Sequence, residues 1–368
     1  MTGPAGDWQR PVTASRRAEI VGTGLIGGSV GMALRGQGWH VSGTDVDPAV
    51  SRAALAVGAI DAPGPDPTAE LVVVATPLGA TTSVVRRILT EGRRRDVVVT
   101  DVAAVKAAVT AAVDDPRFVG GHPMAGSEQV GVAGADASLF AGATWVLTPT
   151  ARTSADAFAT VRSVVTSLGA EVVALEPVQH DDLVAVVSHV PHLTAATLMN
   201  MAGALAEEHA ALLQLAAGGF RDMTRVAAGE PHIWPDVCLA NGPAIVAVLD
   251  RLIDDLGEMR ALVAGSDRDG LLRRLDRAAT ARRAMPVGAQ VPAALAEIRV
   301  PVLDRPGEFS HITTLAGELG FNIFDFEVAH SIEGDRGVAV LVVDGDAVDS
   351  LVPALRQHGY KPSWRRLG

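Results

Sequence analysis

Residues 22–27 have the sequence Gly-Thr-Gly-Leu-Ile-Gly, and this segment decides how the first part of the chain folds. A short β-forming run at 18–22 leads into the glycines, and helical periodicity begins at Leu25 and continues to Gly36. The next expected strand ends at Asp45, 18 residues after the third glycine. A strand, a glycine turn, a helix and an acidic residue in this order are typical of a βαβ unit that binds a dinucleotide.

Each residue type in this segment has a physical role in binding a dinucleotide. The first glycine permits the tight turn, the second lets a pyrophosphate approach the backbone, and the third lets helix and strand pack closely. The helix N-terminus offers N–H groups to the phosphates, and Asp45 would accept hydrogen bonds from ribose hydroxyls while repelling a 2′-phosphate. The pattern therefore predicts NAD rather than NADP, the alternative being a glycine turn that binds nothing. The expected cofactor contacts are Gly22, Gly24, Leu25, Ile26, Gly27, Asp45, Thr76 and Pro77.

The composition is that of an acidic globular protein with more than one domain. The chain has 368 residues, of which 48% are hydrophobic and 20% charged, and this excludes a disordered chain. Acidic residues outnumber basic ones 42 to 31, giving a net charge of −11, so a nucleic-acid partner is not expected. The single cysteine, Cys238, excludes a disulfide framework and a cysteine-based zinc site. Residues 1–17 lack the apolar core of a signal peptide, which predicts a cytoplasmic protein.

One apolar stretch has the length of a membrane span. Residues 183–206 contain no charged side chain, but they include two histidines, a proline and an asparagine. The flanking residues are acidic rather than basic, and this much polarity is costly in lipid. We therefore expect a buried helix and no membrane partner.

The pattern of strands and helices predicts three folded domains. Short apolar strands alternate with helices in the first half of the chain, which indicates a Rossmann-type α/β domain at 18–177 with a parallel sheet. Helical signals alone follow at 178–285, and a linker at 286–296 leads to an α+β segment at 297–368 with the order βαββαβ. Residues 1–17 are expected to form a flexible tail. The strands expected in the first domain are 18–22, 40–44, 71–75, 97–101, 118–121, 144–148 and 171–175, and the helices are 25–36, 48–57, 79–89 and 155–168.

His122 is the candidate for acid–base chemistry. It opens the segment His-Pro-Met-Ala-Gly-Ser-Glu, 122–128, directly after the expected strand 118–121. An imidazole at the carboxyl end of a strand can meet both a nicotinamide and a substrate, and its pKa near neutrality lets it accept a hydroxyl proton as hydride leaves the same carbon. The alternative is a loop histidine that only binds backbone groups.

Two further segments carry polar residues suited to a substrate. His189 and His192 are three residues apart near the start of the apolar helix, which places them on one helix face. No HExxH arrangement is present and no metal site is expected, so the pair serves a substrate or a subunit interface, or consists of core histidines. Arg221 and Arg225 lie near another helix start, and a guanidinium is the best side chain for a carboxylate. The alternative is a solvated surface arginine.

Together these motifs resemble one family, the prephenate dehydrogenases, which with the arogenate dehydrogenases supply tyrosine. The resemblance covers residues 18–290, with the motifs in the same order and at similar spacing. The segments 122–128 and 188–192 are much more specific for the family than the glycine segment is. The match is carried by 22–29, Thr100-Asp101 with Lys106, 122–128 (HPMAGSE), 188–192 (SHVPH) and 220–225 (FRDMTR).

The resemblance implies an oxidative decarboxylation that uses NAD. Prephenate is a cyclohexadiene with a ring hydroxyl, a ring carboxylate and a pyruvyl side chain. Hydride leaves the hydroxyl-bearing carbon and carbon dioxide leaves the opposite carbon, giving 4-hydroxyphenylpyruvate. By this likeness His122 polarises the hydroxyl, Arg225 binds a substrate carboxylate and His192 orients the substrate. Ser127 and His189 are further expected substrate contacts.

One position departs from the family pattern. Many members have a serine two residues before the lysine of the Thr-Asp motif, whereas this chain has Ala104 before Lys106. Either His122 works without this partner, or Ser127 or a water molecule supplies the contact.

The last segment, 297–368, is similar to an ACT regulatory domain, which some family members carry. Its first expected turn is Asp-Arg-Pro-Gly at 304–307, and Gly-Phe-Asn-Ile at 320–323 follows its first helix. Gly307 and Asn322 are expected to contact an effector, with tyrosine first and phenylalanine second. The alternative is a dimerisation domain without a ligand.

Three other functions stay open at this point. An arogenate dehydrogenase would accept an amino-acid side chain in place of the pyruvyl group, and a non-catalytic sensor would bind NAD and an amino acid without using His122. A general hydroxyacid dehydrogenase is disfavoured, because such enzymes usually need a lysine in the helical domain and 151–290 contain none. The leading expectation is a cytoplasmic prephenate dehydrogenase that forms a homodimer through 178–285.

Overall fold

The computed structural model contains two compact units, Met1–Asp267 and Arg268–Gly368. The expectations for Ser127 and for residues 1–14 and 286–294 fall outside the described part of the chain. The structure describes residues 15–91, 93–126, 129–209, 211–285, 295–303, 305, 307–330 and 336–367.

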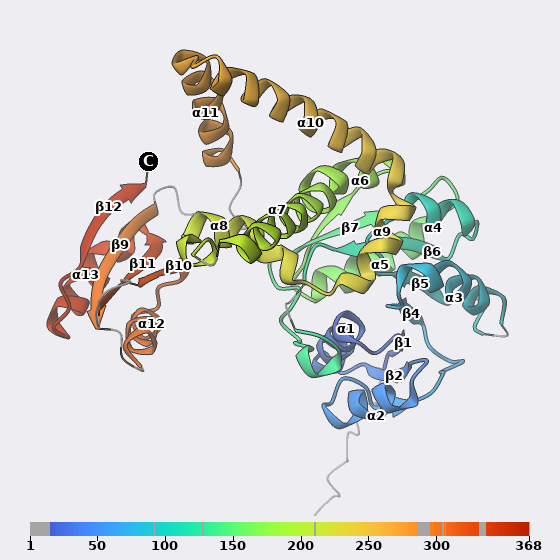
Figure 1. The fold of residues 1–368 in the computed structure, drawn as a ribbon. Coiled ribbons are helices and arrows are strands. Elements are labelled where there is room, and N and C mark those ends of the chain that lie inside the picture. Colours follow the sequence, from blue (N-terminus) through green and yellow to red (C-terminus); the bar gives the residue numbers. More distant parts are fainter. Residues whose placement is uncertain are drawn as a thin grey trace, which may run out of the picture. The chain divides into compact units, whose positions relative to one another are not determined.

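An eight-stranded sheet forms the centre of the first unit (Figure 1). Its strand order is β3-β2-β1-β4-β5-β6-β7-β8, and neighbouring strands are parallel except for β6 and β7. The expectation of a parallel sheet is wrong at this pair, because the described part of the β6–β7 connection contains a short 3-10 turn, Val132–Gly134, and no crossover helix. The strands are β1 (Arg17–Val21), β2 (His40–Thr44), β3 (Ala62–Pro63), β4 (Leu71–Val74), β5 (Val98–Asp101), β6 (Phe118–Pro123), β7 (Thr144–Thr148) and β8 (Glu171–Ala174).

Helices cover both faces of this sheet. In β4, Leu71 and Val73 pack in the cluster that contains α1 and α5, whereas Val72 and Val74 pack in the cluster that contains α3 and α4. Burial on both faces explains why this strand is an unbroken apolar run. The helices are α1 (Leu25–Gly36), α2 (Pro48–Ala56), α3 (Leu78–Thr90), α4 (Ala107–Ala112), which the sequence did not predict, and α5 (Ala155–Ser167).

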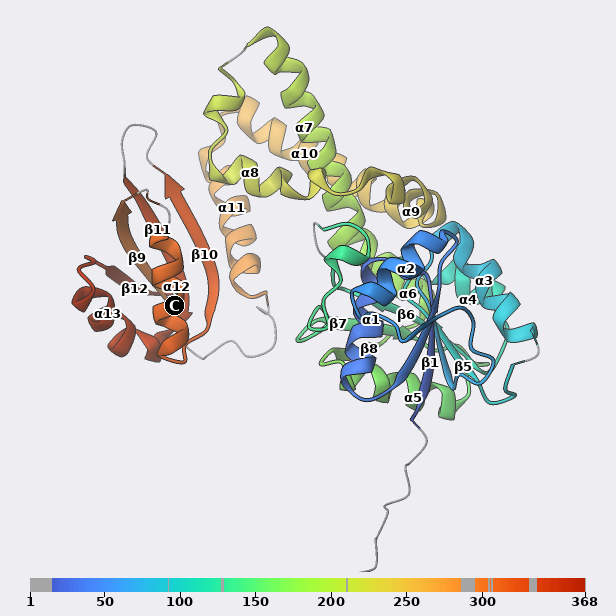
Figure 2. The same ribbon diagram turned by 90° about the horizontal axis from the view of Figure 1, so that it is seen from below.

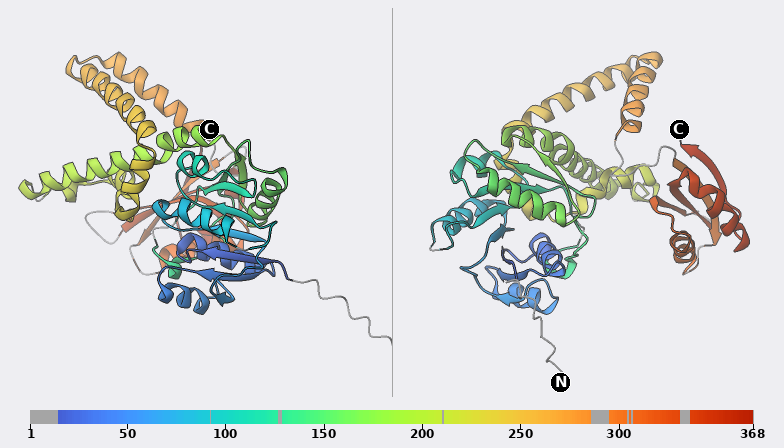
Figure 3. Two further views of the ribbon diagram at one scale, coloured as in Figure 1. Left: turned by 90° about the vertical axis from the view of Figure 1, so that its right-hand side faces the viewer. Right: turned by 180° about the vertical axis from the view of Figure 1, so that it is seen from behind.

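Helices make up the rest of the first unit. α6 continues through a π-helical turn, Ala185–His189, into α7, and Figure 3 shows α7 extending away from the sheet. The helices are α6 (Pro177–Val184), α7 (Val190–Glu208), α8 (Gly218–Thr224), α9 (Trp234–Ala240) and α10 (Gly242–Ala264), with 3-10 turns at Leu213–Leu215, Arg225–Ala228 and Pro231–Ile233.

The apolar stretch on α6 and α7 is more exposed than expected. Pro177–Glu207 is long and apolar enough to cross a membrane by length and composition, and among the described residues it is the one such helix. Only 28% of its most apolar window is buried, and Val187 and Met201 are 66% and 56% exposed. The expectation of a buried helix is therefore wrong for the single chain, because α8, α10 and the turn Arg225–Ala228 cover only part of the circumference of α7.

The second unit contains a four-stranded antiparallel sheet with the order β10-β11-β9-β12 (Figure 2). Alternate residues of β9, Ala296, Ile298 and Val300, face a core formed with α12 and α13. After α11 the elements follow the expected order βαββαβ, and the last strand begins at Ser363. The elements are α11 (Arg268–Arg283), β9 (Leu295–Leu303), α12 (Glu308–Glu318), β10 (Ile323–His330), β11 (Arg336–Asp344), α13 (Val348–Gln357) and β12 (Ser363–Leu367).

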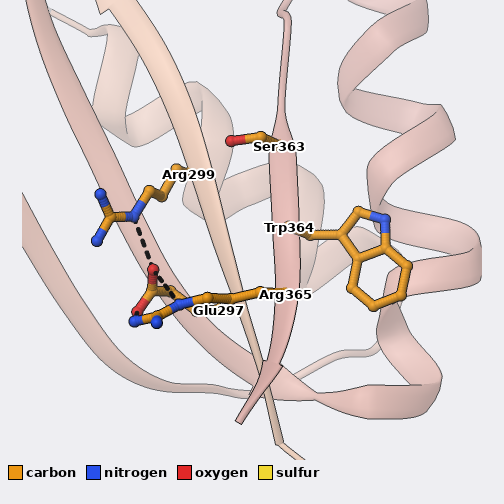
Figure 4. A pocket seen from close by; sticks show the side chains of 5 residues that line it. All are labelled: Glu297, Arg299, Ser363, Trp364 and Arg365. Carbon is orange, nitrogen blue, oxygen red and sulfur yellow. Dashed lines mark hydrogen bonds and ion pairs between the residues drawn. The ribbon is translucent and has the colours of Figure 1, made fainter.

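An ion-pair cluster joins two strands of this sheet (Figure 4). Glu297 on β9 accepts hydrogen bonds from Arg365 Nη2 at 2.6 Å and from Arg299 Nε at 2.7 Å. These bonds lower the pKa of the Glu297 carboxyl to about 2. With Ser363 and Trp364 the three residues line a pocket of about 320 Å³. Because the carboxylate already holds both arginines, we interpret the cluster as a link between β9 and β12.

The start of the first strand differs slightly from the expected tail boundary. Arg17, predicted as the last tail residue, is the first residue of β1, and its Nε donates to Asp66 Oδ2 at 2.7 Å. The side chain of Asp66 is 7% exposed. This ion pair fixes the first residue of the strand to the loop before β4.

Candidate active site

The glycine turn lies at the carboxyl end of β1, against the end of β4. Gly22 has a φ of +94°, which suits glycine alone, and a Cβ at this position would clash with the carbonyl oxygen of Ala75. A Cβ at Gly27 would clash with the carbonyl oxygen of Gly22. Gly24, the N-cap of α1, has open space where a Cβ would stand. The three glycines thus have the geometry expected of a turn that a large ligand approaches closely.

The N-terminus of α1 has the properties that a phosphate needs. Within this fully described helix no side chain caps the N-terminus and no acidic residue occupies the first turn. Asp45 stands beside the turn, where its Oδ2 accepts the N–H of Thr23 at 2.9 Å and its Oδ1 accepts the N–H of Asp47 at 3.1 Å. Thr76 and Pro77 follow β4 at the same edge of the sheet. These residues fit a bound NAD, with N–H groups for the pyrophosphate and a fixed carboxylate for the ribose.

His122 lies near the end of β6, at the same edge of the sheet as the glycine turn, because β6 runs parallel to β5. Its Nδ1 is 2.9 Å from Nε2 of His180 on α6. The other nitrogen of that ring, Nδ1, is 2.7 Å from Oδ1 of Asp181. These three side chains form a hydrogen-bonded chain from a buried carboxylate to a partly exposed imidazole.

The carboxylate fixes the direction of every hydrogen bond in this chain. Asp181 can only accept, so Nδ1 of His180 donates and, in the neutral ring, its Nε2 accepts. His122 Nδ1 must then carry the hydrogen and donate to His180. The Nε2 of a neutral His122 therefore has a lone pair and can accept a proton from a substrate hydroxyl.

The surroundings of His122 favour its neutral form. Burial lowers the pKa of His122 well below its usual range, and the positive charge of Lys106 lowers it further. The imidazole is therefore unprotonated at neutral pH. A neutral imidazole with a free Nε2 lone pair is the form that a general base requires.

A buried ion pair holds the loop beneath the histidines. Lys106 and Asp101 form a salt bridge in which both side chains are 0% exposed, and Lys106 Nζ also donates to the carbonyl oxygen of Gly121 at 2.7 Å. The N–H groups of Lys106 and Ala107, at the start of α4, both donate to the carboxylate of Asp181 at 2.8 Å. Asp181 thus ties α6 to α4 while it orients His180.

The histidines of α7 and its preceding turn face a tryptophan. His192 stacks on Trp234 with ring centroids 3.6 Å apart and an interplanar angle of 13°. The rings of His189 and Trp234 meet edge to face, with their centroids 6.2 Å apart. The two histidines therefore share one side of the helix, as their spacing predicted. His189 is 1% exposed, and burial lowers the pKa of both histidines. Nδ1 of His189 lies 3.1 Å from Nδ2 of Asn241.

Three other expected site residues, Arg225, Gly307 and Asn322, are also among the described residues. Arg225 begins the 3-10 turn that packs against α7, and it is exposed in the single chain. Gly307 lines a cavity of the second unit, but Asn322 is exposed and does not line it. Of the two expected effector contacts, the structure therefore places one at a pocket.

His180, Asp181, Trp234 and Asn241 were missed by the sequence reasoning. His180 and Asp181 precede the apolar helix as an adjacent polar pair, and their position beside a Pro-initiated helix start was the available signal. The side chain of His180 supplies a hydrogen-bond partner for Nδ1 of His122 that the sequence did not indicate.

The comparisons with known proteins agree with this arrangement. The prephenate dehydrogenase nucleotide-binding domain matches residues 30–174, and the prephenate dehydrogenase dimerization domain matches 176–277. The chain is 31% identical over 341 residues to the prephenate dehydrogenase of Bacillus subtilis, an alignment that covers 89% of this chain and 92% of the relative. The chain belongs to the prephenate dehydrogenase family. The resemblance expected from the sequence motifs is confirmed.

Two solved structures of family members match the fold. The Aquifex aeolicus prephenate dehydrogenase in complex with hydroxyphenyl propionate and NAD+ has a TM-score of 0.69 at 28% identity and covers 74% of this chain and 99% of its own. The Synechocystis arogenate dehydrogenase has a TM-score of 0.63 at 29% identity and covers 73% of this chain and 99% of its own. The prephenate dehydrogenase family member described here is thus an NAD-dependent oxidoreductase with a Rossmann-type domain followed by a helical domain.

Proposed function

We propose that this enzyme converts prephenate, with NAD+, to 4-hydroxyphenylpyruvate, carbon dioxide and NADH. The observation that carries the proposal is the free Nε2 lone pair of His122, fixed by His180 and Asp181 at the sheet edge that holds the glycine turn. An alcohol oxidation by hydride transfer needs a base at this place. NAD+, when bound, accepts the hydride from the hydroxyl-bearing ring carbon.

His122 would hold the proton during this reaction. The hydroxyl proton moves to its Nε2 as hydride leaves the adjacent carbon, and the C–C bond to the ring carboxylate breaks to release carbon dioxide. The electron pair of that bond makes the ring aromatic, and the phenol oxygen takes the proton back from His122. His180 and Asp181 keep the imidazole in the tautomer that can accept, and they stabilise the imidazolium that forms.

Arg225 and His192 are the proposed substrate-orienting residues. A guanidinium binds a carboxylate with two parallel hydrogen bonds, and Arg225 lies on the turn that packs against the helix of His192. The stack of His192 on Trp234 holds that imidazole in one orientation. His189 and Ser127 are proposed as further contacts. Because the chain has a net charge of −11, these local groups rather than the overall field must attract a dianionic substrate.

A second substrate, arogenate, is supported by the structural match to an arogenate dehydrogenase. Arogenate has the same ring hydroxyl and ring carboxylate, so the chemistry proposed for His122 is unchanged. The two substrates differ in the side chain, which is a pyruvyl group in one and an amino-acid group in the other. Steady-state formation of NADH from NAD, or of NADPH from NADP, with each substrate decides between them. A higher kcat/KM for arogenate than for prephenate would identify arogenate as the substrate. A higher kcat/KM with NADP than with NAD would contradict the proposed role of Asp45.

We propose that residues 297–368 of the second unit form an ACT-like regulatory domain that binds an aromatic amino acid. Its support is the βαββαβ order and a cavity of about 460 Å³ at the start of α12. In this cavity Tyr360 donates to Glu308 Oε2 at 2.9 Å, and His311 Nδ1 is 3.1 Å from the same hydroxyl. A carboxylate and a helix N-terminus together suit a zwitterion. Gly307 lines the cavity, and Asn322 would have to act from outside it.

The same proposal covers the assembly, the domains and the location of the enzyme. We propose a homodimer joined through the helical domain, 178–285, because α10 exposes Val246, Ile253 and Leu256 and the matching family domain is a dimerization domain. The proposed domain boundaries are those expected from the sequence, including the linker expected at 286–296, except that the structure places Arg17 in β1 and begins β9 at Leu295. A cytoplasmic location follows from the biosynthetic reaction. Sedimentation of the full chain tests the dimer, and a monomer at micromolar concentration would contradict it.

A further inference from the structure

Asn241, between α9 and α10, is a buried residue with two hydrogen-bond partners on one nitrogen. Its side-chain Nδ2 donates to the carbonyl oxygen of Asp181 at 2.8 Å and lies 3.1 Å from Nδ1 of His189. Asn241 is 4% exposed and His189 is 1% exposed. Both contacts therefore form away from solvent, where the choice of donor and acceptor matters most.

The carbonyl of Asp181 settles which way the Asn241 amide faces. A backbone carbonyl can only accept, so the amide NH2 and not the amide oxygen must face it. The same NH2 has a second hydrogen, and Nδ1 of His189 is within its reach. Nδ1 of His189 consequently accepts, and a neutral His189 carries its hydrogen on Nε2. Burial lowers the pKa of His189, which keeps the ring neutral.

Within the described part of the chain, the Nε2–H of His189 is then a donor with no acceptor. Among the described residues, Nε2 of His189 is buried and has no hydrogen-bond partner. An N–H left unpaired in the interior destabilises the protein, so the position of this donor calls for an acceptor in the working enzyme. His189 is joined to the chain that ends at His122, because Asn241 bonds both His189 and the backbone carbonyl of Asp181.

We propose that Asn241 is a positioning residue that keeps His189 in the Nε2–H tautomer, so that His189 donates a hydrogen bond to a carboxylate or carbonyl oxygen of the substrate. This inference rests on the proposed function. The site then holds two neutral imidazoles with opposite hydrogen-bonding roles at Nε2. His122 accepts through Nε2, because its Nδ1–H donates to His180. His189 donates through Nε2, because its Nδ1 accepts from Asn241.

The tautomer is tested by nitrogen NMR of 15N-histidine-labelled full-length enzyme. The His189 signals are identified by their loss in His189→Gln, and the proposal expects a protonated Nε2 and an unprotonated Nδ1. In Asn241→Asp the new carboxylate accepts from Nδ1, so Nδ1 becomes protonated. A wild-type His189 with the hydrogen on Nδ1 would overturn the proposal. This readout does not depend on turnover, so it is distinct from a failure of the proposed function.

The effect on substrate is tested by steady-state kinetics with prephenate and arogenate. Asn241→Asp should raise KM for the accepted substrate about tenfold, the effect of one lost hydrogen bond to a charged oxygen, with the Kd for NAD within about twofold of wild type. Asn200→Asp makes the same charge change at an exposed position on α7 and should leave both constants unchanged. An Asn241→Asp enzyme with a normal KM, or with a weakened NAD affinity alone, would refute the contact with substrate.

A second pair of variants guards against a simple folding defect. His189→Gln can present an amide N–H close to the place of Nε2 without any bond from Asn241, so it should retain a KM within about threefold of wild type. His189→Leu lacks the donor and should show the same tenfold rise in KM as Asn241→Asp. Equal KM values for His189→Gln and His189→Leu in folded protein, shown by circular dichroism, would contradict a donor role for His189.

Discussion

Asp181→Asn replaces one oxygen of the carboxylate on which the histidine chain depends. In the structure Oδ1 accepts from His180 Nδ1 at 2.7 Å and from the N–H of Lys106 at 2.8 Å, and Oδ2 accepts the N–H of Ala107 at 2.8 Å. An asparagine has a single acceptor oxygen, so its NH2 must face either the N–H of Ala107 or the ring of His180. Each orientation has a different cost.

If the NH2 faces the N–H of Ala107, two donors meet in a buried place. Leaving such a group unpaired costs about 1–3 kcal/mol of stability. If the NH2 faces His180, it leaves the N–H of Lys106 without an acceptor, donates to Nδ1 of His180 and moves the ring hydrogen to Nε2. His180 Nε2 then donates to His122 Nδ1, and His122 must carry its hydrogen on Nε2. The base is lost in this tautomer. A wrong tautomer of a catalytic histidine costs up to about 10⁴ in kcat in the serine-protease triad.

Both orientations remove the negative charge that stabilises the imidazolium of His122, and the second also removes the base. We therefore expect Asp181→Asn to lower kcat by roughly 10²–10⁴ while the Kd for NAD changes little. NADH formation with saturating prephenate gives kcat, and quenching of tryptophan fluorescence gives the NAD affinity. Asp182→Asn is the matched control, because it makes the same change at the next residue of α6, which is exposed. A kcat for folded Asp181→Asn within threefold of the Asp182→Asn value would refute the role of this chain.

Four further outcomes follow from the same geometry. Asp45→Asn should narrow the preference for NAD over NADP, because the charge that repels a 2′-phosphate is gone; an unchanged ratio of kcat/KM values would place the discrimination elsewhere. Arg225→Ala should raise the KM for prephenate tenfold or more with a smaller effect on kcat, since a guanidinium bond to a carboxylate contributes about 1.5–3 kcal/mol; a wild-type KM would argue against the contact. Lys106→Met should lower the free energy of unfolding by about 3–5 kcal/mol, because it leaves Asp101 charged and buried, and urea denaturation would measure it. In a plot of kcat/KM against pH, the midpoint of the acid limb should lie below the usual imidazole pKa of about 6.5, because burial and Lys106 lower the pKa of His122 and only the neutral ring accepts a proton. A midpoint above that value would contradict the assignment of His122 as the base.

The regulatory proposal has its own test on the full chain. Tyrosine and phenylalanine are each titrated while NADH formation is followed, and inhibition by one of them supports the ACT-like assignment. Tyr360→Phe removes the hydroxyl that joins Glu308 to His311, so it should weaken that inhibition and leave the uninhibited rate unchanged. A response to neither amino acid would leave the second unit without an effector role.

The fold of the first unit was largely predictable because its signals are local. The glycine turn at 22–27, the apolar strand at 71–74 and the helix at 25–36 each follow from neighbouring residues, and the structure has all three. The antiparallel pairing of β6 with β7 was not predictable, because it depends on how a connection packs. The exposure of α7 was missed for a similar reason, since apolar sequence does not reveal whether the chain itself covers it.

The site was predictable in its residue types but not in its hydrogen bonds. His122, His189 and His192 were recognisable from their segments, and the structure brings the latter two together against Trp234. The partner of His122, by contrast, is 58 positions away in the sequence. No local pattern indicates that such distant residues meet, so His180, and with it the fixed tautomer, emerged only from the folded chain.

The most direct test of the proposed function is the rate of NADH formation from prephenate by the wild-type enzyme and by His122→Asn, measured side by side at saturating NAD. The wild type should form NADH and carbon dioxide in equal amounts, and His122→Asn should be slower by roughly two to four orders of magnitude while it still binds NAD. Wild-type enzyme that forms no NADH from prephenate or arogenate, or a His122→Asn enzyme that works within threefold of wild type, would contradict this account.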